Sequence, residues 1–174
     1  TIETWPSGWT RLIASREFIG KAADGRELFR AGSEWMILDR HSGRPRNLGR
    51  MELGLPATAP KALPDRVRRL RARDGYTRAR SLHVPFSALD FNGHVNNTEY
   101  VRWGLDGMYD AIAPLPLIQS AGMTFLAEAF AGDEIDVCIV QDADRTHVLE
   151  RRAHGDTFTN LFLMEIVHAT SRIA

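Results

Sequence analysis

The sequence predicts an α+β fold in which one long helix packs against an antiparallel sheet. Apolar side chains recur at helical spacing over residues 97–112, and the residues after them divide into four strand-like runs. Turn-forming residues separate these runs, so hairpins should join consecutive strands. A single helix can bury its apolar stripe if such a sheet curls around it.

The composition is that of an ordinary globular protein. The chain has 174 residues, 44% of them hydrophobic, and a net charge of zero, which excludes disordered and fibrous classes. Zero net charge gives no general reason to expect nucleic acid as a partner. No apolar run approaches the roughly 20 residues that a membrane-spanning helix needs. We therefore expect a soluble protein without a membrane span.

The cysteine content predicts the cellular compartment. Cys138 is the single cysteine and cannot form an internal disulfide, and no signal peptide is apparent, so a reducing cytoplasm is expected. The sequence opens on Thr1 rather than on Met, which leaves open a lost upstream targeting peptide.

The first element that we expect is a β-hairpin. Residues 9–21 and 26–39 are strand-like and are joined through Ala23-Asp24-Gly25. No comparable helix accompanies them. Either these strands extend the sheet of the second unit, or they are the end of an equivalent unit whose helix lies upstream.

A linker should follow this hairpin, because prolines recur at positions 56, 60 and 64. We predict a first unit of residues 1–55, a linker of residues 56–76 and a second unit of residues 77–174. Within the linker, residues 65–74 are rich in arginine and are predicted to be helical.

The second unit is predicted to contain one strand, one helix and four further strands. Their expected ranges are 78–84, 97–112, 117–130, 133–142, 145–153 and 156–171. In the helix, the apolar stripe should face the sheet, while Gly104 and Gly107 permit close approach of the strands.

A polar run directly before this helix is the candidate active site. Asp90, Asn92 and His94 alternate, so an extended backbone would send their side chains to one side. Gly93 allows a tight turn. Asn96 suits a helix N-cap, and Glu99 stands three residues later, as in a capping box. A helix start of this kind attracts developing negative charge.

The run Leu89-Asp90-Phe91-Asn92-Gly93-His94-Val95-Asn96-Asn97, with Tyr100 and Trp103, resembles the signature of acyl-ACP thioesterases. The resemblance extends over nearly the whole chain. Its further segments are Thr4-Trp5-Pro6-Ser7-Gly8, Arg16-Glu17-Phe18, Asp24-Gly25, Ala31-Gly32-Ser33-Glu34-Trp35, Asp39, Phe125-Leu126-Ala127-Glu128-Ala129 and Gly132-Asp133-Glu134.

The resemblance implies a tandem (double) hotdog fold, each hotdog being a long helix wrapped by a curled antiparallel sheet. Residues 1–55 would be the C-terminal part of an incomplete first hotdog, and residues 77–174 the second, catalytic hotdog. The implied activity is hydrolysis of the thioester of fatty acyl-[acyl-carrier-protein], which releases free fatty acid and ends fatty acid synthesis. No cofactor is implied, and an incomplete first unit could favour a homodimer.

The catalytic glutamate of the family corresponds to Glu128. Plant members carry a cysteine directly after it, where this chain has Ala129, so we expect attack by activated water rather than by a thiolate. Asp90 and Glu128 are predicted to act as the base, their mutual repulsion raising their proton affinity.

The other residues of the motif are expected to handle the oxyanion and the leaving thiolate. Asn92 would donate to the thioester carbonyl or orient the water, and His94 would polarise the site or pass a proton to the thiolate. The backbone N–H groups of Val95 and Asn96 would complete an oxyanion hole.

Two predictions concern binding. The resemblance implies that the acyl chain lies in the first hotdog, so Trp35 and Met36 are expected to line it. Acyl carrier protein is acidic, so an arginine-rich segment would attract it. The arginines concerned are Arg66, Arg68, Arg69 and Arg71.

Several alternatives stay open at this point. Asp90 could merely form a turn, Glu128 could face solvent on a strand, and the arginines could be a solvated face. The chain could act on acyl-CoA, or bind acyl groups without catalysis. A hotdog hydratase is less well matched, because its Asp-x-Asn-Pro-x-His spacing differs. The remaining histidines lack metal-ligand spacing, so no metal is predicted.

Overall fold

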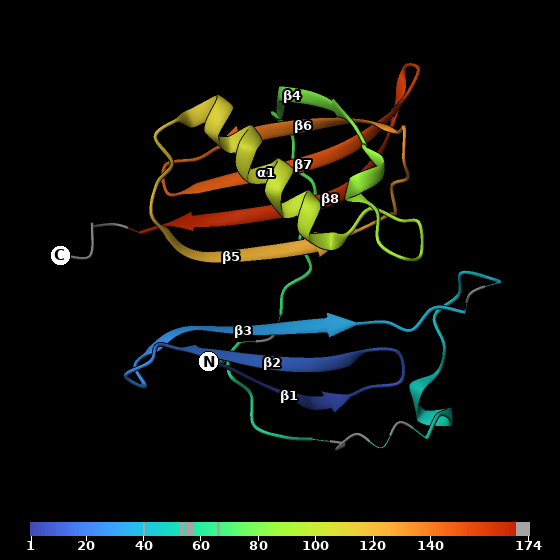
Figure 1. Cartoon of the computed structure of the whole chain (residues 1–174), viewed down its shortest axis with the longest axis vertical. Coiled ribbons are helices and arrows are strands. Elements are labelled where there is room, and N and C mark those ends of the chain that lie inside the picture. The colour runs from blue at the N-terminus through green and yellow to red at the C-terminus, as the bar shows by residue number, and fades with distance from the viewer. Residues whose placement is uncertain (40, 53, 55–57, 66, 170–174) are drawn as a thin grey trace. The chain divides into compact units, whose positions relative to one another are not determined.

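The computed structural model describes all residues except 40, 53, 55–57, 66 and 170–174. The chain divides into two compact units, Thr1–Val67 and Arg68–Ala174, and each is considered by itself (Figure 1).

Unit 1 is a three-stranded antiparallel sheet in the order β1-β2-β3 (Figure 1). Its strands are β1 (Ile2–Trp9), β2 (Ala14–Lys21) and β3 (Glu27–Trp35). The predicted hairpin is present as β2 and β3. The prediction of one strand over residues 9–21 was wrong, because Thr10 N–H bonds to the Ile13 carbonyl at 2.7 Å and turns the chain. The residues before this turn form β1.

Part of the predicted linker packs on the sheet of unit 1. Glu17 on β2 is only 3% exposed and accepts hydrogen bonds from the Ser7 hydroxyl at 2.6 Å and the Ala62 N–H at 3.0 Å. The Lys61 ammonium lies 3.5 Å from the same carboxylate. Burial works against the charge of Glu17, but these partners outweigh it and hold its pKa below the usual value. Residues 59–62 are thereby fastened to unit 1.

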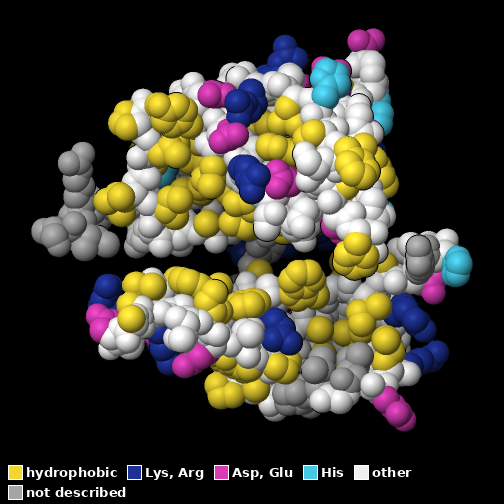
Figure 2. Space-filling view, in the orientation of Figure 1, with side chains coloured by type: hydrophobic (Ala, Val, Ile, Leu, Met, Phe, Trp, Pro, Cys, Tyr) yellow, Lys and Arg dark blue, Asp and Glu magenta, His cyan; other side chains and the backbone are white. Residues whose placement is uncertain are grey.

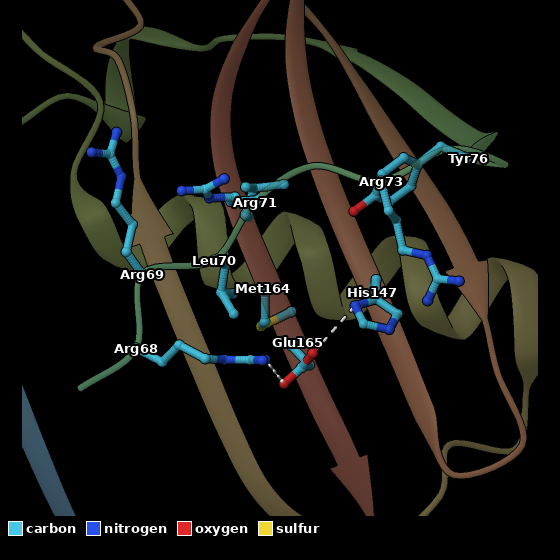
Figure 3. A pocket seen from close by; sticks show the side chains of 10 residues that line it. Arg68, Arg69, Leu70, Arg71, Arg73, Tyr76, His147, Met164 and Glu165 are labelled. Atoms are coloured by element: carbon cyan, nitrogen blue, oxygen red, sulfur yellow. Dashed lines mark hydrogen bonds and ion pairs between the residues drawn. The ribbon is translucent and has the colours of Figure 1, made fainter. Parts of the chain in front are cut away.

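The helix predicted over residues 65–74 is wrong for the residues of that range that the structure describes. Leu70 is buried, and its N–H donates to the Thr124 hydroxyl at 3.0 Å rather than to a helical carbonyl. The segment offers only Val67 and Leu70 as apolar contacts, too few for a stable amphipathic helix. We call residues 68–76, which run over the sheet of unit 2, the strap (Figure 3).

Unit 2 is a five-stranded antiparallel sheet with one long helix lying across it, the hotdog arrangement that the resemblance implied (Figure 1). The strand order is β4-β6-β7-β8-β5. The elements are β4 (Thr77–His83), α1 (Asn97–Ile112), β5 (Ile118–Phe125), β6 (Glu134–Gln141), β7 (Arg145–His154) and β8 (Thr157–His168), with a 3₁₀ turn over Phe86–Ala88. Helix α1 has the bounds that its apolar spacing predicted.

The main core of unit 2 lies between α1 and the sheet. The buried helical side chains Tyr100, Trp103 and Met108 belong to one apolar cluster with residues of β6, β7 and β8. A Cβ on Gly107 would stand 2.5 Å from Cγ1 of Val137, which explains why a glycine occupies this position. On the face of unit 2 that carries α1, basic and acidic side chains alternate among apolar ones (Figure 2).

The other face of the sheet carries a smaller core. Leu70 of the strap covers Cys138, Leu149 and Leu163, with Tyr76 packed beside them. Cys138 is buried there, and burial raises the pKa of its thiol. Within the described part of the chain, no helix is long and apolar enough to cross a membrane.

Candidate active site

The polar motif forms a tight loop at the start of α1. A bridge between Leu89 and Val95 closes it, and inside this bridge Asp90 N–H donates to the His94 carbonyl at 2.8 Å. Gly93 adopts φ +80°, a conformation that favours glycine. The expected extended alternation of residues 90, 92 and 94 is therefore wrong, since the backbone folds back on itself over these residues.

The Asp90 carboxylate is the hub of the loop. Its Oδ1 accepts from the backbone N–H of Asn92 at 2.8 Å and of His94 at 3.3 Å, and its Oδ2 accepts from the Asn92 side-chain amide at 3.4 Å. Asp90 thus fixes both the backbone of the loop and the orientation of the Asn92 amide.

The same contacts set the protonation of Asp90. Partial burial favours the neutral acid, but the N–H groups of Asn92 and His94 outweigh this effect and lower the pKa of Asp90 below its usual value. The expected rise in its proton affinity through repulsion by Glu128 is therefore wrong. The same N–H groups therefore favour the ionised form of Asp90.

The side chains of Glu128 and His94 are in contact. Nδ1 of His94 lies 3.3 Å from Oε1 of Glu128, and the two side chains are 36% and 59% exposed. The strand predicted over residues 117–130 ends at Phe125, so Glu128 lies in the connection between β5 and β6 rather than on a strand. The ring of Phe130 stands edge-on to His94, with centroids 5.2 Å apart. Water can reach both members of the pair.

The backbone of Ala129 joins the Glu128 segment to the motif loop and to α1. Its N–H donates to the Tyr100 hydroxyl at 3.0 Å, and its carbonyl accepts from the Val95 N–H at 2.9 Å. Directly after Ala129, the Asp133 carboxylate accepts from the Phe130 N–H at 2.9 Å and from the Arg152 guanidinium at 2.8 Å.

The N-terminus of α1 is capped as expected, since the Asn96 side chain accepts from the Thr98 N–H at 3.0 Å. The predicted oxyanion hole is wrong in its donors. Val95 N–H is bonded to the Ala129 carbonyl, and Asn96 N–H is bonded to the Ala88 carbonyl at 2.9 Å. Neither N–H is free for a substrate oxygen. The second half of the capping box is absent for the same reason.

The predicted acyl-lining residues lie in unit 1. Trp35 ends β3 and Met36 follows it, and they are 56% and 57% exposed. The Trp35 indole N–H donates to the Ser33 hydroxyl at 2.7 Å.

The arginine-rich segment contributes to a groove on the sheet of unit 2 (Figure 3). Arg68 is paired with Glu165 at 2.6 Å, and Arg73 is paired with Asp142. Arg69 and Arg71 are exposed and take part in no ion pair with any residue that the structure describes. Arg66, the remaining arginine of the prediction, lies outside the described residues.

No local pattern in the sequence predicts the contacts that hold Glu128. Tyr100 belongs to the motif and Asp133 to a turn, and neither position indicates its partner. A hydroxyl four residues after a helix N-cap is a weak signal, because its partner, Ala129, is distant in sequence. Among the described residues, no group of three or more His, Cys, Asp or Glu side chains is arranged to hold a metal ion.

Comparisons with known proteins agree with this architecture. The chain is 26% identical over 133 residues to the chloroplastic palmitoyl-acyl carrier protein thioesterase of Gossypium hirsutum, a match that covers 72% of this chain and 31% of that protein. The chain thus spans about a third of the length of this curated relative.

Two solved structures share the fold. An acyl-ACP thioesterase from Bacteroides thetaiotaomicron superimposes with a TM-score of 0.79 at 21% identity, over 97% of this chain and 68% of its own. The 12:0-ACP thioesterase from Umbellularia californica gives a TM-score of 0.78 at 19% identity, over 97% and 66%. The hotdog fold is thereby confirmed.

A sequence match to a family model establishes the family of this chain. The model of the acyl-ACP thioesterase C-terminal domain matches residues 72–160, just over half of the chain, and includes both the motif loop and Glu128. This chain therefore belongs to the acyl-ACP thioesterase family.

Proposed function

We propose that this protein hydrolyses the thioester bond of fatty acyl-[acyl-carrier-protein] and releases free fatty acid. The observation that carries the proposal is the pairing of His94 Nδ1 with Glu128 Oε1 at 3.3 Å, beside an Asn92 amide held by Asp90. A carboxylate and an imidazole are thus in contact, and the Asn92 amide lies in the same loop as His94, two residues before it. Family membership and the palmitoyl-acyl carrier protein thioesterase of Gossypium hirsutum support the substrate class.

In the proposed reaction, Glu128 takes a proton from water as the water oxygen attacks the thioester carbonyl carbon. The carbonyl oxygen becomes an oxyanion, which the Asn92 amide stabilises as a hydrogen-bond donor. When the carbon–sulfur bond breaks, His94 passes a proton to the departing thiolate and recovers one from Glu128. The products are a carboxylic acid and a free thiol.

Asp90 has a supporting role in this proposal. Its lowered pKa keeps it ionised, so its carboxylate continues to hold the Asn92 amide and the His94 backbone throughout the reaction. The base is then Glu128 alone. This division replaces the shared base expected from the sequence.

The domain assignment is part of the proposal. We infer that residues 1–55 are the C-terminal part of a first hotdog, that residues 56–76 connect it to the second, and that residues 77–174 are the catalytic hotdog. The acyl chain would contact Trp35 and Met36 of the first. The single cysteine supports a reducing compartment such as the cytoplasm, and a homodimer stays a prediction.

Acyl carrier protein is proposed to dock on the strap. Arg69 and Arg71 are suited to this role because their charges are exposed and unpaired within the described residues, whereas Arg68 is occupied by Glu165. Reversing Arg69 and Arg71 to Glu should raise the KM for acyl-ACP and leave small thioesters unaffected. Arg11→Glu, an exposed charge reversal in unit 1, is the matched control. Equal effects on both substrate types would refute docking.

The test of the activity is thiol release from C8 to C18 acyl-ACPs and from matched acyl-CoAs. Glu128→Ala and Asn92→Ala should each lower kcat about 100-fold or more. Glu134→Ala, which removes an exposed carboxylate at the start of β6, should not. Absence of thiol release from folded protein would favour an acyl-binding role, and preference for acyl-CoA would reassign the carrier.

A further inference from the structure

The Ala129 peptide group is the structural link between the two members of the catalytic pair. Ala129 is fully buried, and it directly follows Glu128 in the chain. Its carbonyl accepts from the N–H of Val95, the neighbour of His94, at 2.9 Å. A displacement of this peptide group would therefore move Glu128 relative to His94.

The side chains of the pair are not themselves fixed by packing. His94 is 36% exposed and Glu128 is 59% exposed, so solvent surrounds much of each. Their mutual geometry depends on the backbone that carries them. The peptide unit that joins Glu128 to Ala129 is held by the hydroxyl of Tyr100, which accepts the Ala129 N–H at 3.0 Å.

Tyr100 is a rigid support for this hydrogen bond. It lies in the first turn of α1, is 2% exposed, and contacts the rings of Trp103, Phe125 and Phe162 at centroid distances of 5.7, 6.0 and 5.8 Å. Burial raises its pKa to about 12, so the phenol stays neutral at physiological pH. Its oxygen therefore remains a fixed, neutral acceptor.

We propose that Tyr100 is a positioning residue, whose hydroxyl holds the Ala129 peptide and thereby sets the distance between Glu128 and His94. The inference rests on the proposed function of that pair. Asp133 accepts from the Phe130 N–H, and Arg152 donates to the Glu128 carbonyl at 3.4 Å, a longer contact on the same peptide unit. Among the described hydrogen bonds, Tyr100 is the acceptor of the Ala129 N–H.

The test is Tyr100→Phe, which removes the hydroxyl and keeps the ring in the aromatic cluster. We expect kcat for acyl-ACP to fall about tenfold or more, because small misplacement of catalytic groups is costly, while KM changes less than about twofold. The Ala129 amide hydrogen should also exchange faster with solvent. Tyr109→Phe, a change at a 61% exposed tyrosine of the same helix, should alter neither quantity.

The outcomes separate this inference from the proposed function. Unchanged kcat in Tyr100→Phe, or a fall in melting temperature with kcat preserved, would overturn the positioning role. If the wild-type protein releases no thiol, the proposed function fails instead. Amide exchange at Ala129 needs no activity, and an unchanged exchange rate in Tyr100→Phe would overturn the inference in that case as well.

Discussion

Replacing Glu150 by glutamine should change how the stability of this protein depends on pH. Glu150 lies on β7, is fully buried, and neither carboxylate oxygen has a hydrogen-bond partner among the described residues. Its Oε1 is 3.4 Å from the position that a Cβ on Gly104 of α1 would take, so the group lies under the helix. Burial raises its pKa well above the usual value.

The size of the effect follows from proton linkage. Below the unfolded-state pKa of about 4.3, Glu150 is protonated in both the folded and the unfolded state, so its ionisation does not change the free energy of unfolding. Above that pH the unfolded chain loses the proton and the folded protein keeps it, so the free energy of unfolding falls by about 1.4 kcal/mol per pH unit. The fall ends when the pH reaches the raised folded-state pKa.

Glutamine has nearly the same shape and does not titrate. The stability difference, Glu150→Gln minus wild type, should therefore be near zero at pH 4.5 and should grow by about 1.4 kcal/mol per pH unit above it. Contributions of the other carboxylates are common to both proteins and cancel.

The assay is urea unfolding of both proteins, followed by tryptophan fluorescence, at half-unit steps from pH 4.5 to 8. Glu134→Gln, a change at an exposed carboxylate, serves as the control and should give a difference that does not vary with pH. A Glu150→Gln difference that stays flat over this range would refute the reasoning, because it would mean that Glu150 is ionised in the folded protein.

Three further predictions concern stability and are measured by thermal or urea unfolding. Gly107→Ala should destabilise the protein by about 1 to 3 kcal/mol, less any gain in helix propensity, because the new Cβ would lie 2.5 Å from the rigid side chain of Val137. Gly104→Ala should cost less, since the nearest atom, at 2.9 Å, is the flexible end of Met164. Asn96→Ala should cost about 1 kcal/mol by removing the N-cap of α1, and no loss would argue against the cap. Glu17→Gln should lower the free energy of unfolding by about 1 to 3 kcal/mol at pH 7. Because the folded-state pKa of Glu17 is lowered, this loss should shrink as the pH falls through that pKa. A loss that is independent of pH would contradict the ionisation of Glu17.

Sequence alone determined the elements whose signal is local. The apolar spacing and the N-cap residue fixed helix α1 at Asn97–Ile112, and the turns at Gly132 and Gly155 separated strands that the structure contains. These features depend on residues within a few positions of one another, which is why a linear pattern predicts them. The motif also predicted that Asp90, Asn92 and His94 lie directly before α1, and the structure places them in one loop there.

Tertiary structure decided which partners these residues have. The roles expected for the Val95 and Asn96 N–H groups were wrong because Ala129 and Ala88 supply their acceptors, and no local pattern reveals such partners. The Asp90 carboxylate accepts two N–H groups of its own loop, because the backbone turns toward it. A buried N–H must find an acceptor wherever the fold places one. That requirement, and not residue type, set the geometry around Glu128 and His94.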